Sequence, residues 1–352
     1  MTARLRVLVA DDSAAARVLL QGILESDPQL EVVGQAVDGL EAVTLADRLA
    51  PDVITMDVDM PGIDGLEATR RIMASAPRPI VLVSGVFPPD DLDNSFRALE
   101  AGAVTLLGKP EGPGTPSFTR EAAELVATVK LMAGVKLVRR SASRPQPGGE
   151  APPGPETDRA APPLRVVAIA ASTGGPPALA AVLRALPAGW PVPVLVVQHI
   201  GAGFDTGLVR YLGDCTPLPV TLAEDRHPIG DPGVHVCPAD RHLGVTAGER
   251  LSVIGGGPID GYQPSANHLF RTVAGVYGPA AAGVVLTGMG RDGADGLLAL
   301  RREGGLAIAQ DQATSVVYGM PRQAVLRGAV DAVLAVEAIG PALAARLGPR
   351  RR

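Results

Sequence analysis

Short apolar runs alternate with amphipathic segments along the first part of the chain. Apolar positions recur at helical spacing over residues 13–23, where Ser13 is suited to cap the helix, and again over residues 119–137. Five runs have the length and composition of buried strands: residues 5–10, 32–36, 53–56, 80–83 and 103–107. Repeated strand–helix units of this kind predict a doubly wound parallel sheet. We therefore expect residues 1–138 to form a five-stranded α/β domain.

The same alternation returns over residues 164–348, with more irregular connections. A buried strand starts at Val166, and further strands are expected at residues 192–197, 233–237, 282–286 and 306–309. Helices are expected at residues 178–186, 203–212, 265–276 and, as the last element, 321–327. A hairpin is expected around Ala247 and Gly248. These elements predict a second α/β domain, with a Rossmann-like and mostly parallel sheet.

The stretch between the two domains has a different composition. Residues 141–163 contain seven prolines and three glycines among 23 residues, with almost nothing apolar to bury. Such a segment is expected to be an extended, mobile tether. We therefore place a linker at residues 139–163, which would let one domain meet and gate the other.

The bulk composition excludes several classes of protein. A net charge of -5 and an aromatic content of 3% argue against a nucleic-acid partner. The two cysteines, Cys215 and Cys237, are too few for a disulfide framework and lie in no metal-binding motif. No apolar run reaches the ~18 residues of a membrane span, and acidic residues follow the N-terminus too closely for a signal peptide. The expectation is a cytoplasmic protein without membrane insertion.

Polar residues follow four of the strands expected in the first domain. Asp11 and Asp12 come after the first strand, Asp57 after the third, Ser84 after the fourth and Lys109 after the fifth. The carboxyl ends of parallel strands meet at one edge of the sheet, so three carboxylates would repel there unless a hard cation such as Mg²⁺ lay among them. A lysine and a hydroxyl could then stabilise a phosphoryl group transferred to one aspartate. Taken singly, each residue could also be an ordinary strand-end or capping residue.

A second set of polar residues follows strands of the second domain. Ser172 lies in the turn V-V-A-I-A-A-S-T-G-G-P-P, His199 directly follows an apolar strand, and Asp292 lies in T-G-M-G-R-D-G. The turn lacks the dinucleotide pattern G-x-G-x-x-G, and Ala170 breaks the nucleophile pattern G-x-S-x-G. A serine needs a base, and the base needs an orienting acceptor, so the three residues fit a hydrolytic triad. Their spacing alone also allows a phosphate-binding turn, a structural histidine and a helix-capping aspartate.

The motifs of the first domain resemble those of two-component receiver domains. They are D-D-S, D-V-D-M-P-G-I-D-G-L, S-G and K-P, in this order. The resemblance implies that Asp57 is the phospho-acceptor and that a sensor histidine kinase is the phosphodonor. It also implies that Asp12 and Asp57 bind Mg²⁺ together with the backbone carbonyl of Asp59, and that Asp11 lies in the outer shell of the metal.

The same resemblance assigns the remaining polar residues of this edge. Ser84 would be the switch hydroxyl, although Gly85 follows it where relatives more often have serine or threonine. Lys109 would contact the phosphate. The family also has a cis peptide at the position of Lys109–Pro110, which is a bond where proline lowers the cost of the cis form.

Five segments of the second domain resemble the catalytic domain of the chemotaxis protein-glutamate methylesterases (CheB). They are A-S-T-G-G-P-P-A-L, V-V-Q-H-I, P-S-A-N-H-L-F-R-T-V-A, G-V-V-L-T-G-M-G-R-D-G-A-D-G and A-Q-D-Q-A-T-S-V-V-Y-G-M-P. The resemblance implies Ser172 as nucleophile, His199 as general base and then acid, and Asp292 as the orienting carboxylate. Thr173 would support the histidine, and the Met289 N–H would help to form the oxyanion hole.

The resemblance also implies what the protein acts on. The substrate would be a glutamyl methyl ester on the cytoplasmic helices of a chemoreceptor, with methanol as product, and receptor glutamines would be a further substrate. Phosphorylation of Asp57 would relieve a block of the catalytic cleft by the receiver. Two alternatives stay open: the same chemistry in a receptor array that does not control motility, and a phosphorylation-dependent adaptor with little catalysis. Ile200-Gly201 and Ala266-Asn267 depart from the usual family pattern, at positions that would affect substrate docking.

Overall fold

The computed structural model describes residues 4–85, 105–134, 162–201, 203–230 and 232–347. The chain divides into two compact units, Met1–Gln146 and Pro147–Arg352, which are described separately. The linker expected at residues 139–163 falls almost entirely outside the described residues, as do residues 103–104 of an expected strand and 135–137 of an expected helix.

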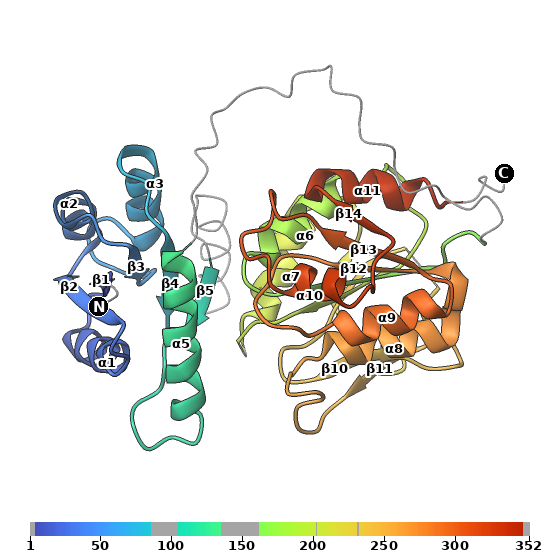
Figure 1. The fold of residues 1–352 in the computed structure, drawn as a ribbon, viewed down its shortest axis with the longest axis horizontal. Coiled ribbons are helices and arrows are strands. Elements are labelled where there is room, and N and C mark those ends of the chain that lie inside the picture. Colours follow the sequence, from blue (N-terminus) through green and yellow to red (C-terminus); the bar gives the residue numbers. More distant parts are fainter. Residues whose placement is uncertain (1–3, 86–104, 135–161, 202, 231, 348–352) are drawn as a thin grey trace. The chain divides into compact units, whose positions relative to one another are not determined.

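The first unit contains the expected five-stranded sheet, with every neighbouring pair parallel (Figure 1). The strand order is β2-β1-β3-β4-β5, which is that of a doubly wound, flavodoxin-like fold. The strands are β1 (Leu5–Ala10), β2 (Leu30–Ala36), β3 (Val53–Met56), β4 (Ile80–Ser84) and β5 (Thr105–Gly108). The helices are α1 (Ala14–Glu25), α2 (Gly39–Leu49), α3 (Gly65–Ser75) and α5 (Phe118–Ala133).

Side-chain caps begin three of these helices where the sequence changes from apolar strand to polar turn. The Ser13 hydroxyl accepts a hydrogen bond from the Ala16 N–H, as the sequence predicts, and Asp38 and Asp64 cap α2 and α3 in the same way. Helices α1 and α5 cover one face of the sheet, and α2 and α3 cover the other. The parallel strands of this sheet are therefore packed between two layers of helices, and their carboxyl ends lie at the same edge.

The second unit is built around a seven-stranded sheet in which all neighbouring strands are parallel. The order is β14-β13-β12-β6-β7-β9-β8. Its strands are β6 (Val166–Ala171), β7 (Val194–Gln198), β8 (Val220–Leu222), β9 (Val234–Val236), β12 (Ala281–Val285), β13 (Leu306–Gln310) and β14 (Ala332–Leu334). The expected hairpin is present as the antiparallel pair β10 (His242–Val245) and β11 (Leu251–Ile254).

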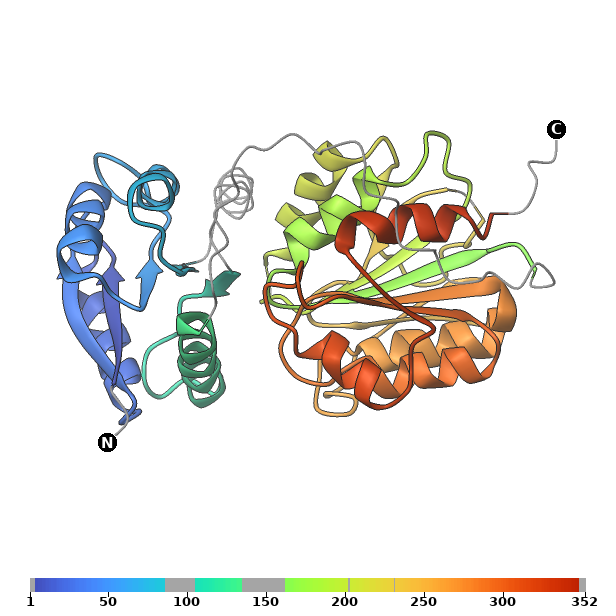
Figure 2. The same ribbon diagram turned by 45° about the horizontal axis from the view of Figure 1, so that its top comes forward.

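Helices cover both faces of this sheet, as Figure 2 shows for the second unit. Helices α6, α7 and α11 form one layer, and α8, α9 and α10 form the other. Their bounds are Gly175–Arg184, Asp205–Cys215 and Val336–Ala344 for the first layer, and Ala266–Tyr277, Ala294–Arg302 and Met320–Leu326 for the second. Every residue of the central strand β6 is buried, which explains its uninterrupted apolar sequence.

The expectation that a helix over residues 321–327 completes the fold is wrong, because β14 and α11 follow it. Strand β14 has only three residues at an edge of the sheet, so it leaves little apolar pattern. Helix α11 contains Gly340 and Pro341, which are residues that normally argue against a helix. Gly340 is needed there because a Cβ would lie 2.6 Å from the Cβ of Ala185. Close packing against Ala185, which the sequence pattern does not show, therefore explains why this helix contains a glycine.

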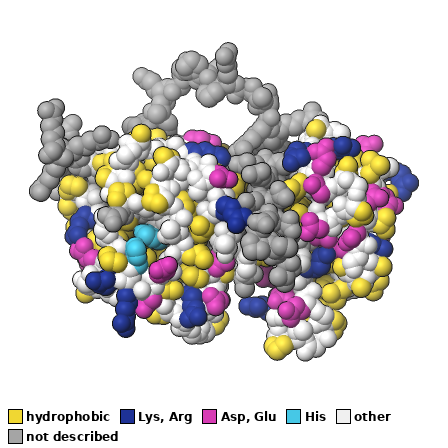
Figure 3. All heavy atoms as spheres, turned by 180° about the vertical axis from the view of Figure 1, so that it is seen from behind, with side chains coloured by type: hydrophobic (Ala, Val, Ile, Leu, Met, Phe, Trp, Pro, Cys, Tyr) yellow, Lys and Arg dark blue, Asp and Glu magenta, His cyan; other side chains and the backbone are white. Residues whose placement is uncertain are grey.

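Two further features concern the surface and the membrane. On the face drawn in Figure 3, the described lysine, arginine, aspartate and glutamate side chains are interspersed over the second unit and do not gather into one basic patch. Among the described helices, none is long and apolar enough to span a bilayer.

Candidate functional site

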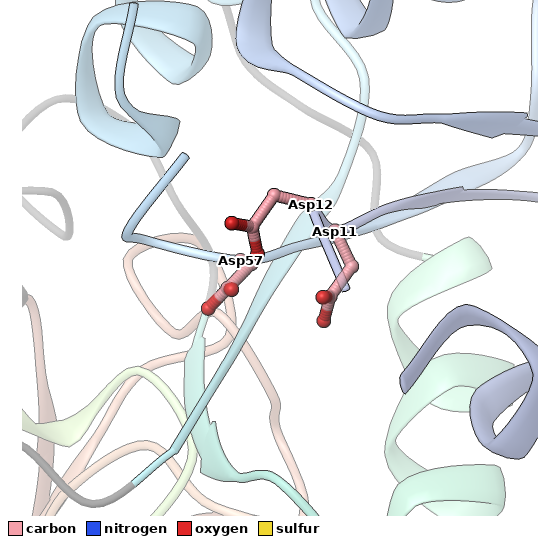
Figure 4. Close-up of side chains that lie close together, drawn as sticks. All are labelled: Asp11, Asp12 and Asp57. Atoms are coloured by element: carbon pink, nitrogen blue, oxygen red, sulfur yellow. The ribbon is translucent and has the colours of Figure 1, made fainter. Parts of the chain in front are cut away.

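Three carboxylates converge at the carboxyl edge of the first sheet. Asp11 and Asp12 follow β1, and Asp57 follows β3, so the parallel pairing of these strands brings them together (Figure 4). One oxygen atom from each lies within 4.8 Å of the others. Asp11 and Asp57 are buried, whereas Asp12 is exposed.

Lys109 joins this cluster from the end of β5. Its Nζ lies 2.7 Å from Asp11 Oδ2 and 3.0 Å from Asp57 Oδ2. The Lys109 N–H donates to the Ser84 carbonyl at 2.6 Å, which fixes the lysine beside the end of β4. Burial raises the pKa of Asp57, and Asp11 adds to this rise, although Lys109 opposes it. For Lys109 itself, burial lowers the pKa, but the hydrogen bond to Asp11 and the charge of Asp57 outweigh burial and raise it.

The cluster fits a divalent cation by its donor set. Three carboxylates face a single ammonium group, so negative charge remains in excess, and all-oxygen ligands with an exposed side suit Mg²⁺. Asp59 is exposed and lies two residues after Asp57, in the turn between β3 and α3. The expected cis peptide at Lys109–Pro110 is wrong: in the described part of the chain the cis bond is Gln263–Pro264.

Gly65 lies in the D-V-D-M-P-G-I-D-G-L motif, but the sequence pattern assigns it no role. It begins α3, and a Cβ there would lie 1.9 Å from the carbonyl oxygen of Asp57. The Gly65 N–H donates to the Val58 carbonyl at 2.9 Å. Only glycine lets α3 approach the strand end this closely, so this residue determines how near the helix lies to the Asp57 backbone.

In the second unit, the ends of β6, β7 and β12 bring Ser172, His199 and Asp292 to one edge. The Ser172 N–H donates to the Thr287 carbonyl at 3.0 Å, and the His199 N–H donates to the Ala171 carbonyl at 2.9 Å. His199 Nε2 lies 2.9 Å from Asp292 Oδ2. Since Nε2 faces the carboxylate, Nδ1 is the nitrogen left for proton exchange. Within the described residues, the Ser172 hydroxyl makes no hydrogen bond to the His199 ring.

Asp292 is buried at the N-terminus of α8, a neighbouring helix. Four groups donate to its carboxylate oxygens: the N–H groups of Ala266 at 2.6 Å, Asn267 at 3.0 Å and Gly293 at 2.9 Å, and the Ser265 hydroxyl at 3.3 Å. The alternative interpretation of Asp292 as the cap of its own helix is wrong, because Gly293 is the capping residue of α9.

The surroundings of Asp292 favour its ionised form. Burial alone would raise its pKa, but the hydrogen bond with His199 and the N–H groups of Ala266 and Asn267 outweigh burial, so the pKa lies below its ordinary value. The positive end of the helix dipole acts in the same direction. A carboxylate that stays ionised at neutral pH is what a histidine base needs as its partner.

Gln198 ties the candidate nucleophile to the candidate base. This buried residue ends β7, and its Nε2 donates to the carbonyls of Ser172 at 2.8 Å and His199 at 2.9 Å. Its Oε1 faces Gly175, where a Cβ would lie only 2.0 Å away. The glutamine adjoins His199 in the V-V-Q-H-I segment, but nothing in that pattern reveals this bridge.

Tyr262 is a second neighbour of the histidine that the sequence does not reveal. Its ring stacks on the His199 imidazole, with centroids 5.3 Å apart and planes 9° apart. Its hydroxyl accepts a hydrogen bond from the Arg291 N–H at 3.3 Å. The tyrosine therefore holds one face of the imidazole and also supports the turn that carries Asp292.

The two supporting residues expected from the sequence lie beside Ser172. The Thr173 carbonyl accepts a hydrogen bond from the Thr287 hydroxyl at 3.0 Å, which fixes the turn after β6. Among the described residues, no hydrogen bond joins Thr173 to His199, and the N–H groups of Thr173 and Met289 donate to no protein acceptor. A Cβ at Gly288 would lie 2.7 Å from the Ser172 Cβ, so the turn before Met289 touches the serine.

Comparisons with known proteins agree with both halves of this description. The CheB methylesterase family model matches residues 167–343. The model of the response regulator receiver domain matches residues 7–115.

Relatives match this chain over nearly their whole length. Protein-glutamate methylesterase/protein-glutamine glutaminase 3 of Anaeromyxobacter dehalogenans is 51% identical over 341 residues, covering 97% of this chain and 98% of that protein. Protein-glutamate methylesterase/protein-glutamine glutaminase 4 of Myxococcus xanthus is 49% identical over 343 residues, covering 97% and 96%.

A solved structure supports the fold of the second unit. The CheB methylesterase catalytic domain of Thermotoga maritima is 34% identical, with a TM-score of 0.50, and the match covers 51% of this chain and 97% of that one. The chain therefore belongs to the protein-glutamate methylesterase/protein-glutamine glutaminase (CheB) family and carries a receiver domain ahead of its methylesterase domain.

Proposed function

We propose that this protein is a phosphorylation-activated hydrolase that removes methyl groups from glutamyl methyl esters on the cytoplasmic helices of chemoreceptors. The observation that carries the proposal is the buried, ionised Asp292 holding His199 at the strand edge where Ser172 lies. The names of the relatives support the ester substrate and add glutamine deamidation as a second reaction of the same acyl chemistry.

The chemistry follows from the roles of five groups. Ser172 attacks the ester carbonyl while His199 accepts its proton at Nδ1, and Asp292 stabilises the imidazolium that forms. The N–H groups of Thr173 and Met289 donate to the oxyanion. His199 then returns the proton to the methoxide, and methanol leaves. Water attacks the acyl-serine by the reverse of these proton transfers and releases the glutamate.

The receiver domain would control this reaction. Asp57 accepts a phosphoryl group from a sensor histidine kinase, Lys109 pairs with the phosphoryl oxygens, and Ser84 donates its hydroxyl to them. Asp12, Asp57 and the Asp59 carbonyl would hold Mg²⁺, with Asp11 in its outer shell, and the cation would neutralise charge on the phosphoryl oxygens. The proposed layout is a receiver at residues 1–138, a linker at 139–163 and a catalytic domain at 164–348. A cytoplasmic location follows from the kinase and the receptor helices.

Methanol release from methylated receptor cytoplasmic fragments tests the proposal. It is measured with and without a small-molecule phosphodonor and Mg²⁺, for the wild type and for Ser172→Ala. We expect release that rises with phosphodonor and disappears in Ser172→Ala, while Asp57 is still phosphorylated in the variant. Release near the wild-type rate from Ser172→Ala would exclude this serine as nucleophile. No release by the wild type would favour the adaptor alternative.

A further inference from the structure

A polar pocket of about 340 Å³ adjoins the triad in the second unit. It is lined by residues from the β11–α8 connection, α8, the turn that carries Asp292, α9 and the end of α10: Asp260, Tyr262, Asn267, Arg291, Asp295 and Arg327. Two of the lining residues also contact the triad. Tyr262 stacks on the His199 ring, and the Asn267 N–H donates to Asp292. A group bound in the pocket would therefore lie next to the reacting ester.

Both aspartates that line this pocket are paired with an arginine, whereas Arg291 has no acidic partner among the described residues. Asp295 forms an ion pair with Arg327. Asp260 pairs with Arg271 at 2.8 Å. Within the described part of the chain, the exposed Arg291 guanidinium makes neither an ion pair nor a hydrogen bond. Both carboxylates of the pocket are thus neutralised, and one arginine is left without a counter-charge.

The backbone holds Arg291 in a fixed place. Its N–H donates to the Tyr262 hydroxyl, and a Cβ at the preceding Gly290, whose φ is +92°, would lie 2.7 Å from that same hydroxyl. The next residue, Asp292, is anchored by the α8 N-terminus. The guanidinium therefore starts from a rigid turn, one residue away from the carboxylate that orients the base.

We propose that this pocket is a substrate subsite in which Arg291 binds a side-chain carboxylate of the substrate helix, one turn from the methylated glutamate. The inference rests on the proposed function and adds a determinant of substrate choice. Residues three or four apart on a helix lie about 5–6 Å apart and face the same side, so an ester at Ser172 brings such a neighbour along the same surface. Arginine suits this role because its planar fork matches a carboxylate.

The test uses the full chain, activated with phosphodonor, and two synthetic helical peptides. Each peptide has one glutamyl methyl ester, and the residue four positions away is Glu in one and Asn in the other, since a glutamine there could itself be deamidated. We expect the wild type to favour the Glu peptide by about fivefold in kcat/KM, mainly through KM, because the contact is formed before the chemical step. The preference should weaken at high salt, because an exposed ion pair is screened.

Variants assign the preference to one side chain. Arg291→Ala should bring the ratio of the two kcat/KM values close to one, and Arg291→Glu should favour the Asn peptide. Arg302→Ala, which removes an exposed arginine on α9 outside the pocket, should keep the wild-type ratio.

Each contrary result has a separate meaning. Equal hydrolysis of both peptides by the wild type, or a preference that survives in Arg291→Ala, overturns the subsite and leaves the esterase intact. Hydrolysis of neither peptide, nor of methylated receptor fragments, overturns the proposed function and the subsite with it. The salt dependence of the wild type tests the ion pair without any variant, because a preference unchanged by salt contradicts such a pair.

Discussion

Two aspartates at strand ends have opposite electrostatic surroundings. Asp292 faces the N-terminus of α8 and His199, which together lower its pKa despite burial. Burial raises the pKa of Asp57, and the nearby Asp11 adds to that rise. Asp292 is thus stabilised as an anion by protein groups alone, as the partner of a base should be. Asp57 pairs with Lys109, but burial outweighs this pairing, so a cation or a phosphoryl group at its edge would change its surroundings strongly.

Asp292→Asn should therefore destabilise the second unit in a pH-dependent way. At neutral pH we expect a loss of about 3 kcal/mol in the free energy of unfolding, because buried N–H donors lose a charged acceptor. A lowered native pKa gives stability that is complete above the ordinary value of 3.8 and is lost as the pH falls through the native pKa. Urea titrations should show a constant wild-type-to-variant difference above about pH 5 that shrinks below about pH 4.

The control for this experiment is Asp214→Asn, which changes an exposed aspartate on α7 and should be nearly neutral at every pH. A difference between wild type and Asp292→Asn that widens as the pH falls would contradict the assignment of an ionised Asp292.

At the scale of elements, one glutamine joins two strand ends. Gln198 holds the carbonyls of Ser172 and His199 from the end of β7. Gln198→Leu should lower kcat by about 10- to 100-fold with little change in KM, because small misplacements of reacting groups slow chemistry more than binding. Gln198→Glu should be as harmful, since its oxygens repel both carbonyls. Gln21→Leu, on α1 of the other unit, should leave methanol release unchanged; a wild-type kcat in both Gln198 variants would refute the bridge.

Gly65 lets α3 lie close to the end of β3, and Gly22 on α1 provides a control because no atom lies near it. Gly65→Ala places a Cβ 1.9 Å from the Asp57 carbonyl oxygen, so α3 must shift away from β3. We expect a loss of about 2 kcal/mol or more in unfolding free energy, and slower phosphorylation of Asp57. Gly22→Ala on α1 meets nothing within 4 Å and should stabilise by about 0.5–1 kcal/mol. Thermal unfolding of both variants measures these changes in stability. Equal shifts in Tm would contradict a close contact between α3 and β3 at Gly65.

The sequence predicts the elements better than the contacts between them. The apolar runs locate β1 and β3 to the residue, because buried strands need continuous apolar segments. They miss β14 and α11, where an edge position and a Gly-Pro pair hide the pattern. The strand-end positions of Ser172, His199 and Asp292 follow from topology. Tyr262 on His199 and α8 on Asp292 depend on distant chain segments, which periodicity cannot show.

At the scale of the whole molecule, the two units separate signal reception from chemistry. The carboxylate cluster of Asp11, Asp12 and Asp57 lies in the first unit, and the edge with Ser172, His199 and Asp292 lies in the second. Each unit has its own sheet with helices on both faces. Under the proposed function, phosphorylation would act on catalysis through the equilibrium between domain arrangements, because the described residues of the two sites belong to different units.

Asp57→Asn should consequently leave a low methanol release that no phosphodonor raises. The variant keeps the second unit intact but lacks the carboxylate that accepts the phosphoryl group. A tenfold activation of the wild type needs only about 1.4 kcal/mol of difference between the two domain arrangements, which two added charges and a cation can supply. Methanol release with and without phosphodonor measures this, with Asp47→Asn, an exposed aspartate of α2, as the variant that stays activatable. Strong activation of Asp57→Asn would mean that the gate responds to another residue, while loss of its basal release would mean that Asp57 also supports the catalytic unit.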